Sequence, residues 1–423
     1  MKIEKLVLLG LGYIGLPTAC TFANHGVKVI GVDVQETIVE TLNSGKIHIH
    51  EPGLLSAMKK ALSFNTLEIS LQPQEADAFI IAVPTPFYDE KKADLSYVKA
   101  AAQTVVPYLR KGNLVILEST SPPLTTQNVL VPILERSGLK AGTDFMVAYS
   151  PERVLPGKIL TELVENARVI GGVNPESAQA GKELYSIIVK GEIITTDAVT
   201  AEMVKLMENT YRDINIAIAN EFARLADRFG VNVWEAIDIA NLHPRVEILR
   251  PGPGVGGHCI SVDPWFLIEA APDLTHLINA ARIVNDSQPH FVIKDLEVLL
   301  GTIKGKRISI LGLAYKPDVD DLRESPAIEI ARLLQQKGAY VCAFEPNNHN
   351  CLLDGIKIAI TLEDCIADGD LLLVLVAHKE FKRLTPTMLH NNTKARVIYD
   401  AVNVIDSQDF MKHGFSVKKL GEP

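Results

Sequence analysis

Cys259 follows directly on a run of glycine and proline. The segment 250–258 has four glycines and two prolines, which excludes a regular helix or strand and leaves backbone N–H groups open to a ligand. Asp263 and Pro264 then predict the start of a helix. A thiol just before a helix N-terminus lies near the positive end of the dipole, which favours the reactive thiolate. Alone, such a segment is more often a turn around a buried, inert cysteine, so a nucleophilic role depends on the rest of the chain.

A long predicted helix carries three hydrogen-bond donors on one face. No proline or glycine interrupts residues 198–229, which predicts one helix of about 30 residues, long enough to bridge two domains. Lys205, Asn209 and Arg212 fall at i, i+4 and i+7 and therefore share a face. Asparagine is a poor helix former in mid-helix, so this stripe indicates an anion or oxyanion site. A solvated helix face remains the alternative.

The first 33 residues carry the pattern of a dinucleotide-binding loop. A buried-strand pattern at 5–9 runs into a Gly-x-Gly-x-x-Gly turn, a helical stretch, a second strand at 27–32 and an acidic residue. The predicted cofactor-binding residues here are Gly10, Gly12, Tyr13, Ile14, Gly15 and Asp33. We expect Gly12 to admit the pyrophosphate at the helix N-terminus and Asp33 to accept from the ribose hydroxyls. Because no arginine follows Asp33, the sequence predicts NAD rather than NADP.

Polar turns follow three further apolar strands of the first domain, at 77–83, 113–118 and 145–149. In open parallel sheets, ligands bind beyond the carboxyl ends of the strands. Thr85, Thr120 and Glu152 are therefore placed to line one crevice. Each of them alone could equally be a cap or a turn residue.

The last 120 residues or so repeat this alternation. Strand patterns at 306–311, 340–344 and 371–376 predict a second Rossmann-like sheet, and Ser325 with Pro326 predicts a helix start. Gly312 ends the first of these strands, but the later glycines of an NAD loop are missing. Lys316 and Arg323 would lie at the ligand end and could hold the phosphates of a second nucleotide. Exposed loop charges are the alternative.

These elements predict an α/β chain with two Rossmann-like parallel-sheet domains, joined by a central helical domain with a long connecting helix. A chain of 423 residues is too long for one core. We expect a dinucleotide-binding domain at 1–195, a central helical domain at 196–300 and a second nucleotide-binding domain at 301–423.

Composition narrows the possible partners. Apolar residues make up 47% of the chain and charged residues 22%, as in soluble globular proteins, and the net charge of −9 argues against a nucleic-acid surface. The five cysteines are scattered without Cys-x-x-Cys spacing, which argues against a disulfide framework or a zinc site. We find neither a signal-peptide pattern nor an apolar run of membrane-spanning length. We therefore expect a cytoplasmic protein without a metal, a membrane or a nucleic-acid partner.

Together these motifs resemble the UDP-glucose/UDP-mannuronate dehydrogenase family along essentially the whole chain. The matching segments are Gly10–Gly15 with Asp33, Val83–Pro86, Glu118–Thr120, Ser150–Arg153, Lys205 with Asn209, Gly256–Cys259 with Asp263, and Lys316 with Arg323–Ser325. Within the family, Ile47–Ile49, His243–Val246, Pro251–Cys259 and Val262–Phe266 are most similar to members that oxidise UDP-N-acetyl-D-mannosamine. Members that oxidise UDP-N-acetylglucosamine share the His-Cys pair and remain the alternative. One departure is Leu124, where relatives commonly carry glycine.

The resemblance implies a four-electron oxidation of the C6 hydroxyl of a UDP-sugar to a carboxylate, with two NAD and one water consumed. Cys259 would form a thiohemiacetal and then a thioester. Lys205 and Asn209 would stabilise the oxyanion, with Lys205 also as acid or base, and Asp263, Thr120 and Glu152 would position and activate water. The nucleotide-sugar contacts would come from Arg153, Val154, Lys205, Asn209, Arg212, His243, Arg245 and Gly256, those to UDP from Tyr315 and Lys316, and further NAD contacts from Thr85, Thr120 and Arg323.

The resemblance also implies a homodimer or a higher homo-oligomer, with His243 and Arg245 reaching across the interface, and a product used in surface polysaccharide synthesis. Two other hypotheses stay open. A one-step NAD dehydrogenase would not need Cys259. A non-catalytic NAD-binding sensor would need neither Cys259 nor Lys205.

Overall fold

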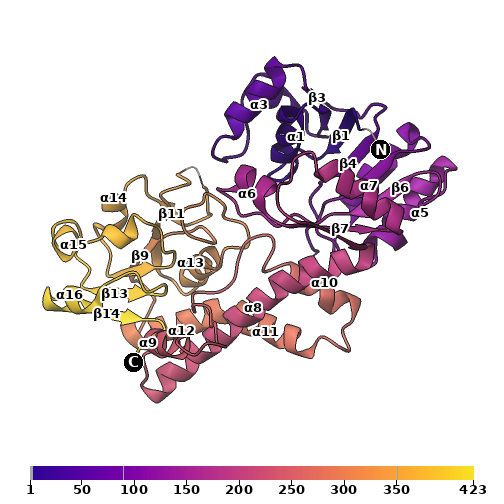
Figure 1. The fold of residues 1–423 in the computed structure, drawn as a ribbon. Coiled ribbons are helices and arrows are strands. Elements are labelled where there is room, and N and C mark those ends of the chain that lie inside the picture. The colour runs from indigo at the N-terminus through magenta and orange to yellow at the C-terminus, as the bar shows by residue number, and fades with distance from the viewer. Residues whose placement is uncertain (1–2, 89, 350) are drawn as a thin grey trace. The chain divides into compact units, whose positions relative to one another are not determined.

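The computed structural model describes residues 3–88, 90–349 and 351–423. The chain folds as two compact units, which are coloured along the sequence in Figure 1. The first unit runs to Glu208 and includes Trp265–Pro272. The second unit consists of Asn209–Pro264 and Asp273–Pro423. The chain passes between the units at three points, the first of them within one long helix, between Glu208 and Asn209.

An eight-stranded sheet forms the centre of the first unit, in the order β3-β2-β1-β4-β5-β6-β7-β8. Its strands are β1 (Lys5–Leu9), β2 (Lys28–Val32), β3 (Leu67–Ser70), β4 (Ala78–Ile81), β5 (Leu114–Leu117), β6 (Met146–Tyr149), β7 (Arg168–Gly172) and β8 (Ile193–Asp197). Among the described strands of this sheet, only β6 and β7 pair antiparallel. The central strands are runs of valine, leucine and isoleucine, because helices cover both faces of the sheet.

Alternate residues of each strand of this sheet point into two different cores. Leu6 and Leu8 of β1 pack with α1 (Gly15–Asn24), α3 (Leu54–Ser63) and α7 (Pro175–Tyr185). Val7 and Leu9 pack on the other face with α4 (Ser96–Val105), α5 (Val131–Leu134) and the start of α8 (Ala198–Phe229). The remaining helices of the unit are α2 (Glu36–Asn43) and α6 (Ile159–Glu165). The predicted helix at 198–229 is confirmed as α8.

The second unit has a six-stranded parallel sheet in the order β11-β10-β9-β12-β13-β14. Its strands are β9 (Arg307–Leu311), β10 (Tyr340–Phe344), β11 (Lys357–Ile358), β12 (Leu371–Val374), β13 (Val397–Asp400) and β14 (Ser416–Lys419). One face packs on α8, α9 (Val233–Ala240), α12 (Gln288–Leu300) and α13 (Pro326–Gln336), and the other on α14 (Leu362–Ile366), α15 (Pro386–Asn392) and α16 (Ser407–Lys412). Helices α10 (Asp263–Ala270) and α11 (His276–Asp286) complete the helical region.

The predicted fold class is therefore confirmed: two Rossmann-like parallel-sheet domains accompany a central group of helices that includes the long α8. The predicted cap of α13 is also present, since the Ser325 side chain accepts a hydrogen bond from the N–H of Ala327 and Pro326 occupies the first turn. Within the described part of the chain, we find no helix with the length and apolar character that crossing a membrane requires.

Candidate active site

The glycines of the first loop fit a dinucleotide. Gly10 has a φ of +93° and a Cβ there would lie 2.5 Å from the carbonyl oxygen of Ala82, while a Cβ on Gly15 would overlap the carbonyl oxygen of Gly10. Gly12 is different, because a Cβ at this position would meet no atom within 4 Å. Gly10 and Gly15 are thus required by packing, whereas Gly12 leaves open space in front of the N-terminus of α1, where a diphosphate binds in such loops.

Asp33 is held at the end of β2 as a fixed acceptor. One carboxylate oxygen accepts from the N–H of Leu11 (3.0 Å) and the other from the N–H of Gln35 (3.0 Å). The side chain is only partly buried, and Val34 beside it is largely exposed and uncharged. This arrangement suits the ribose hydroxyls of NAD, and the residue that follows Asp33 offers no charge for a 2′-phosphate.

Lys205 and Glu152 contact each other in the first unit. The ammonium of Lys205, a buried residue of α8, donates to the backbone carbonyl of Glu152 (2.8 Å). The carboxylate of Glu152 forms an ion pair with Arg168 of β7 and also accepts from the N–H of Arg153 (2.7 Å). Glu152, which follows β6, is thereby held at both its backbone carbonyl and its carboxylate.

Behind Glu152 lies a buried network that the sequence analysis missed. Arg168 also contacts the carboxylate of Glu118 (3.1 Å) and the hydroxyl of Ser150 (2.9 Å), and its guanidinium lies 4.1 Å from the ring centroid of Tyr185. The Tyr185 hydroxyl donates to the same oxygen of Glu118 (2.9 Å). Burial raises the pKa of Glu118 to about 7, although Arg168 lowers it; the nearby carboxylate of Glu152 raises it further. The guanidinium of Arg168 thus forms ion pairs with two carboxylates, those of Glu118 and Glu152.

Four further residues of the first unit were predicted to contact NAD or the sugar nucleotide. Thr85, Thr120 and Val154 are half-buried. The Arg153 guanidinium pairs with Glu208 of α8 (2.6 Å). Their predicted roles toward NAD and the sugar nucleotide stay predictions.

Leu124 occupies a backbone conformation that favours glycine. Its φ is +71°, its side chain is largely exposed, and its N–H donates to the carboxylate of Glu202 (2.6 Å). Glu202, which is buried in the first turns of α8, also accepts from the N–H (2.8 Å) and the hydroxyl (2.7 Å) of Thr126. The position at which the resemblance implied a glycine is therefore a left-handed turn fixed by a buried carboxylate.

Leu124→Gly is expected to raise the free energy of unfolding by about 1 kcal/mol, because an L-residue pays roughly that strain in the left-handed region. Urea denaturation followed by circular dichroism measures the effect. Leu124→Ala is the matched control, since it removes the same exposed side chain but keeps the strain. Equal stability of the two variants would contradict this account.

In the second unit the glycine-rich loop 250–258, here called the cysteine loop, packs against Tyr315. A Cβ on Gly256 would overlap the carbonyl oxygen of Glu324 and lie 2.9 Å from the Tyr315 Cβ. Gly257 has a φ of +86°, and a Cβ there would lie 2.7 Å from the Tyr315 ring. Only glycine lets the loop lie on this turn, so packing within the protein requires Gly256 and Gly257. The predicted contact of Gly256 with the sugar nucleotide stays a prediction.

Cys259 is presented at the end of that loop. Its backbone carbonyl accepts from the N–H groups of Val262 (3.0 Å) and Asp263 (2.8 Å), and its side chain is half-buried. The hydrogen bonds that fix this turn use the main chain, so the sulfur itself is not needed to hold it.

Asn209 and Asp263 form a buried pair. The amide of Asn209, on α8, donates to the carboxylate of Asp263 at the start of α10 (2.5 Å). Of the remaining predicted contacts in this unit, Arg212, His243 and Arg245 are exposed. The N–H of Arg245 donates to the His243 ring (3.3 Å).

The turn after β9 carries the predicted UDP contacts. Burial raises the pKa of Tyr315 to about 12, helped by the nearby side chains of Asp321 and Cys259. The ammonium of Lys316 lies 6.0 Å from the Tyr315 ring centroid. Arg323 donates to both carboxylate oxygens of Asp321 (2.9 and 2.6 Å), so the predicted cofactor contact is also a clamp on an acid of its own turn.

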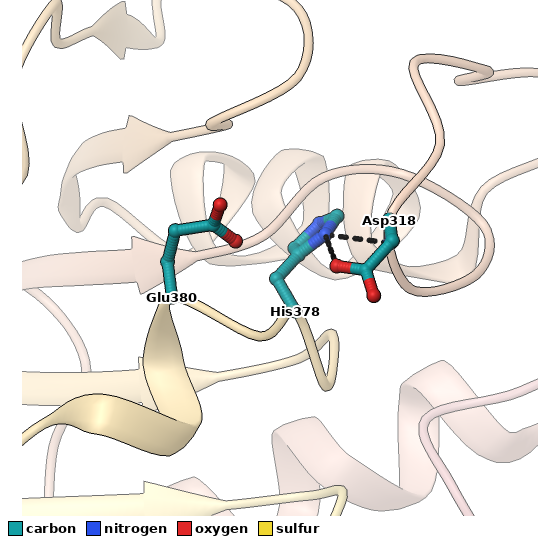
Figure 2. Close-up of side chains that lie close together, drawn as sticks. All are labelled: Asp318, His378 and Glu380. Carbon is teal, nitrogen blue, oxygen red and sulfur yellow. Dashed lines mark hydrogen bonds and ion pairs between the residues drawn. The ribbon is translucent and has the colours of Figure 1, made fainter. Parts of the chain in front are cut away.

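One group of side chains in the described ranges has metal-ligating atoms within 4.8 Å of one another: Asp318, His378 and Glu380 (Figure 2). His378 is fully buried and its ring nitrogens are already engaged. Nδ1 accepts from the N–H of Asp318 (2.9 Å), and Nε2 lies 3.2 Å from the carboxylate of Glu345. We therefore interpret His378 and Asp318 as parts of a hydrogen-bond network that holds the turn after β9.

Three family models match consecutive parts of this chain. They describe the NAD-binding domain of the UDP-glucose/GDP-mannose dehydrogenase family at residues 4–189, its central domain at 199–287 and its UDP-binding domain at 309–407. The chain belongs to the UDP-glucose/GDP-mannose dehydrogenase family. The predicted resemblance is thus confirmed, and with it an NAD-dependent dehydrogenase.

Relatives within this dehydrogenase family cover nearly the whole chain. A UDP-N-acetyl-D-mannosamine dehydrogenase from Methanococcus maripaludis is 47% identical over 99% of this chain and 97% of its own. An NDP-N-acetyl-D-galactosaminuronic acid dehydrogenase from Ralstonia solanacearum is 46% identical over 95% of this chain and 96% of its own. The solved structure of the UDP-D-ManNAc dehydrogenase from Pyrococcus horikoshii is 40% identical, with a TM-score of 0.91 and 99% of both chains covered.

Proposed function

We propose that this dehydrogenase oxidises the C6 hydroxyl of UDP-N-acetyl-D-mannosamine to the carboxylate, with two NAD and one water consumed per sugar. The observation that carries the substrate is the similarity, over almost the full length of both chains, to a relative of that name. The observation that supports the chemistry is the glycine-dependent loop that presents Cys259. The product, an acidic nucleotide sugar, would serve surface polysaccharide synthesis.

Each half of the chain contributes its own groups to this proposal. The open face at Gly12 and the carboxylate of Asp33 would hold the diphosphate and ribose of NAD, which would supply the hydride acceptor. Tyr315 and Lys316 hold the UDP moiety, and Arg153, Val154, Arg212, His243, Arg245 and Gly256 contact the sugar nucleotide. Thr85, Thr120 and Arg323 contact the NAD.

The reacting carbon is served by a small set of polar groups. Lys205 takes the alcohol proton, and with Asn209 it stabilises the oxyanion that develops at C6, each such donor contributing roughly 3–4 kcal/mol. Cys259 adds to the aldehyde to give a thiohemiacetal, whose oxidation gives a thioester. Asp263, Thr120 and Glu152 position the water that hydrolyses it.

Counting NADH per sugar tests the proposal. The full chain is incubated with NAD and limiting UDP-N-acetyl-D-mannosamine, UDP-N-acetylglucosamine, UDP-N-acetylgalactosamine or UDP-glucose. We expect two NADH per sugar, and the highest kcat/KM with the manno sugar. One NADH per sugar would indicate a one-step dehydrogenase, and none with any sugar would indicate an NAD-binding sensor.

A galacto-configured substrate is the second candidate. It follows from the relative in Ralstonia solanacearum, whose identity to this chain is nearly the same. The side-by-side assay separates the two candidates, because a preference for UDP-N-acetylgalactosamine by kcat/KM would select the second.

We further propose that the chain is a homodimer or a higher homo-oligomer. Five large apolar side chains repeat along α8 at intervals of seven, four, three and four residues and are exposed: Tyr211, Ile218, Phe222, Leu225 and Phe229. An exposed apolar stripe of this kind on a monomer favours association. A monomer in sedimentation velocity at micromolar concentration would overturn this part. The five free thiols support placing the reaction in the reducing cytoplasm.

A further inference from the structure

His258 lies beside Cys259 and faces an acid that Arg323 fixes. Its Nδ1 lies 3.6 Å from a carboxylate oxygen of Asp321, and the neighbouring Cys259 side chain raises the pKa of its ring. Asp321 in turn accepts from the backbone N–H of Arg323 (3.0 Å) and from its guanidinium. The order is thus thiol, imidazole, carboxylate, with an arginine behind the carboxylate.

Hydrogen bonds from neighbouring segments hold the turn that carries Asp321. His378 accepts from the N–H of Asp318, as Figure 2 shows, and the N–H of Lys379 donates to the Asp318 carboxylate (3.1 Å). The amide of Asn348 donates to the carbonyl of Asp320 (3.0 Å). The cysteine loop joins the same turn, because the N–H of Gly257 donates to the carbonyl of Arg323 (3.0 Å). Hydrogen bonds therefore join the segment that carries Cys259 to the turn that carries Asp321.

The charges around the imidazole favour its protonated form. Burial lowers the pKa of His258, but Asp321 and the Cys259 side chain raise it and Arg323 lowers it slightly, which leaves the pKa raised to about 9. The groups that face His258 are Asp321, Cys259 and Arg323, and Tyr315, against which the loop packs, is the other titratable group of this turn. An imidazolium at neutral pH can donate to the sulfur and cannot accept from it.

We propose that His258, oriented by Asp321, is the acid–base partner of Cys259. The pair shares one proton, which rests on the imidazole and leaves the sulfur as a thiolate, and His258 gives up this proton during addition to the aldehyde. The sulfur lone pair forms the C–S bond, the C=O π pair moves to oxygen, and the imidazolium proton passes to that oxygen. The thiohemiacetal then contains all atoms of thiol plus aldehyde, with no net proton gained or lost. Nucleophile, base and orienting acid follow the general logic of activated nucleophiles.

This inference deepens the proposed function and rests on it for the aldehyde, but its test needs neither NAD nor sugar. The full chain is alkylated with iodoacetamide between pH 5.5 and 8, and the peptide that contains Cys259 is quantified by mass spectrometry. We expect wild-type alkylation to vary little over this range. In His258→Gln it should follow an ordinary thiol with a pKa near 8.5, and at pH 6.5 be about 10-fold slower than wild type.

Two further measurements make the test specific. Asp321→Asn keeps the imidazole but removes its orienting charge, and should also steepen the pH dependence of Cys259 alkylation. Cys351, a half-buried thiol of the same unit, is the internal control, and its alkylation should be the same in all three proteins. Circular dichroism verifies that each variant is folded; Asp321→Asn alone decides the matter if His258→Gln does not fold.

Superimposable Cys259 profiles in wild type and variants would overturn the role of His258. That outcome is compatible with two NADH per sugar, in which case the proposed function stands and this inference fails. Conversely, a wild-type chain that oxidises none of the four sugars, but whose Cys259 alkylation responds to His258→Gln, would sink the proposed function and keep the thiol–imidazole pair.

Discussion

Cys259→Ser is expected to lower uronate formation at least about 10³-fold, because the chain then lacks the nucleophile of the proposed covalent step. A serine hydroxyl is not ionised near neutral pH and is a far weaker nucleophile than a thiolate. The substitution should not disturb the fold, since the hydrogen bonds that fix this turn use the backbone carbonyl of Cys259. Mass spectrometry of the sugar product and the yield of NADH per sugar measure the effect, and we expect no more than one NADH per sugar.

The matched control is Cys351→Ser, which makes the same change at another half-buried free thiol of the second unit. It should keep two NADH per sugar. A Cys259→Ser protein that still yields two NADH and the carboxylate would remove the thioester from the mechanism, and the water-activating groups would then have to act on an aldehyde hydrate. The comparison therefore distinguishes covalent from non-covalent oxidation.

The sequence predicts those parts of the fold in which local pattern and tertiary environment agree. Strands β1, β4 and β5 are continuous apolar runs, and α8 is a long stretch without glycine or proline, so their positions are predicted within one or two residues. Strands β3, β7, β8, β11, β13 and β14 were not predicted. β3 has only four residues, with a glutamate among them, and β7 begins with Arg168 and ends in two glycines. Such segments become strands only because a neighbour pairs with them.

In the candidate site, too, the residues of contiguous motifs were predicted and the contacts between distant residues were not. Motifs that are contiguous in sequence, such as the first glycine loop and the Gly256–Cys259 segment, were predicted, and the structure gives the packing reason for their glycines. Asp321 beside His258, and Arg168 behind Glu152, were missed. Each lies 16 or more residues from its partner, and in a single sequence nothing distinguishes an arginine at a strand end from an exposed charge. The signal that could have been used is Glu118, a carboxylate that ends an apolar strand and therefore needs a buried cation.

Arg168→Met is expected to destabilise the first unit by about 3–5 kcal/mol, since it removes one partner of a buried ion pair and leaves the other charged. Two carboxylates, Glu118 and Glu152, would lose the same guanidinium, and both lie in the protein interior or at its margin, with side-chain exposures of 0% and 9%. Methionine fills most of the arginine's volume, so the loss reports charge rather than a cavity. Urea denaturation of the variant and of wild type at pH 8 measures it.

Arg110→Met is the matched control in the same unit. Arg110 pairs with Glu75 at 2.8 Å, but both side chains are more than half exposed, so the same substitution should cost no more than about 1 kcal/mol.

The pH dependence of the stability lost in Arg168→Met is a second measurement. Because burial raises the pKa of Glu118 above its ordinary 4.5 to about 7 even with Arg168 present, the variant's folded state gains a proton in this range, which stabilises it at low pH and is lost as pH rises. The deficit should therefore be smaller at pH 5 than at pH 8, and adding Glu118→Gln to Arg168→Met should recover part of it at pH 8. A deficit that is independent of pH and unchanged by Glu118→Gln would mean that Arg168 stabilises the sheet by packing on Tyr185, not by its charge.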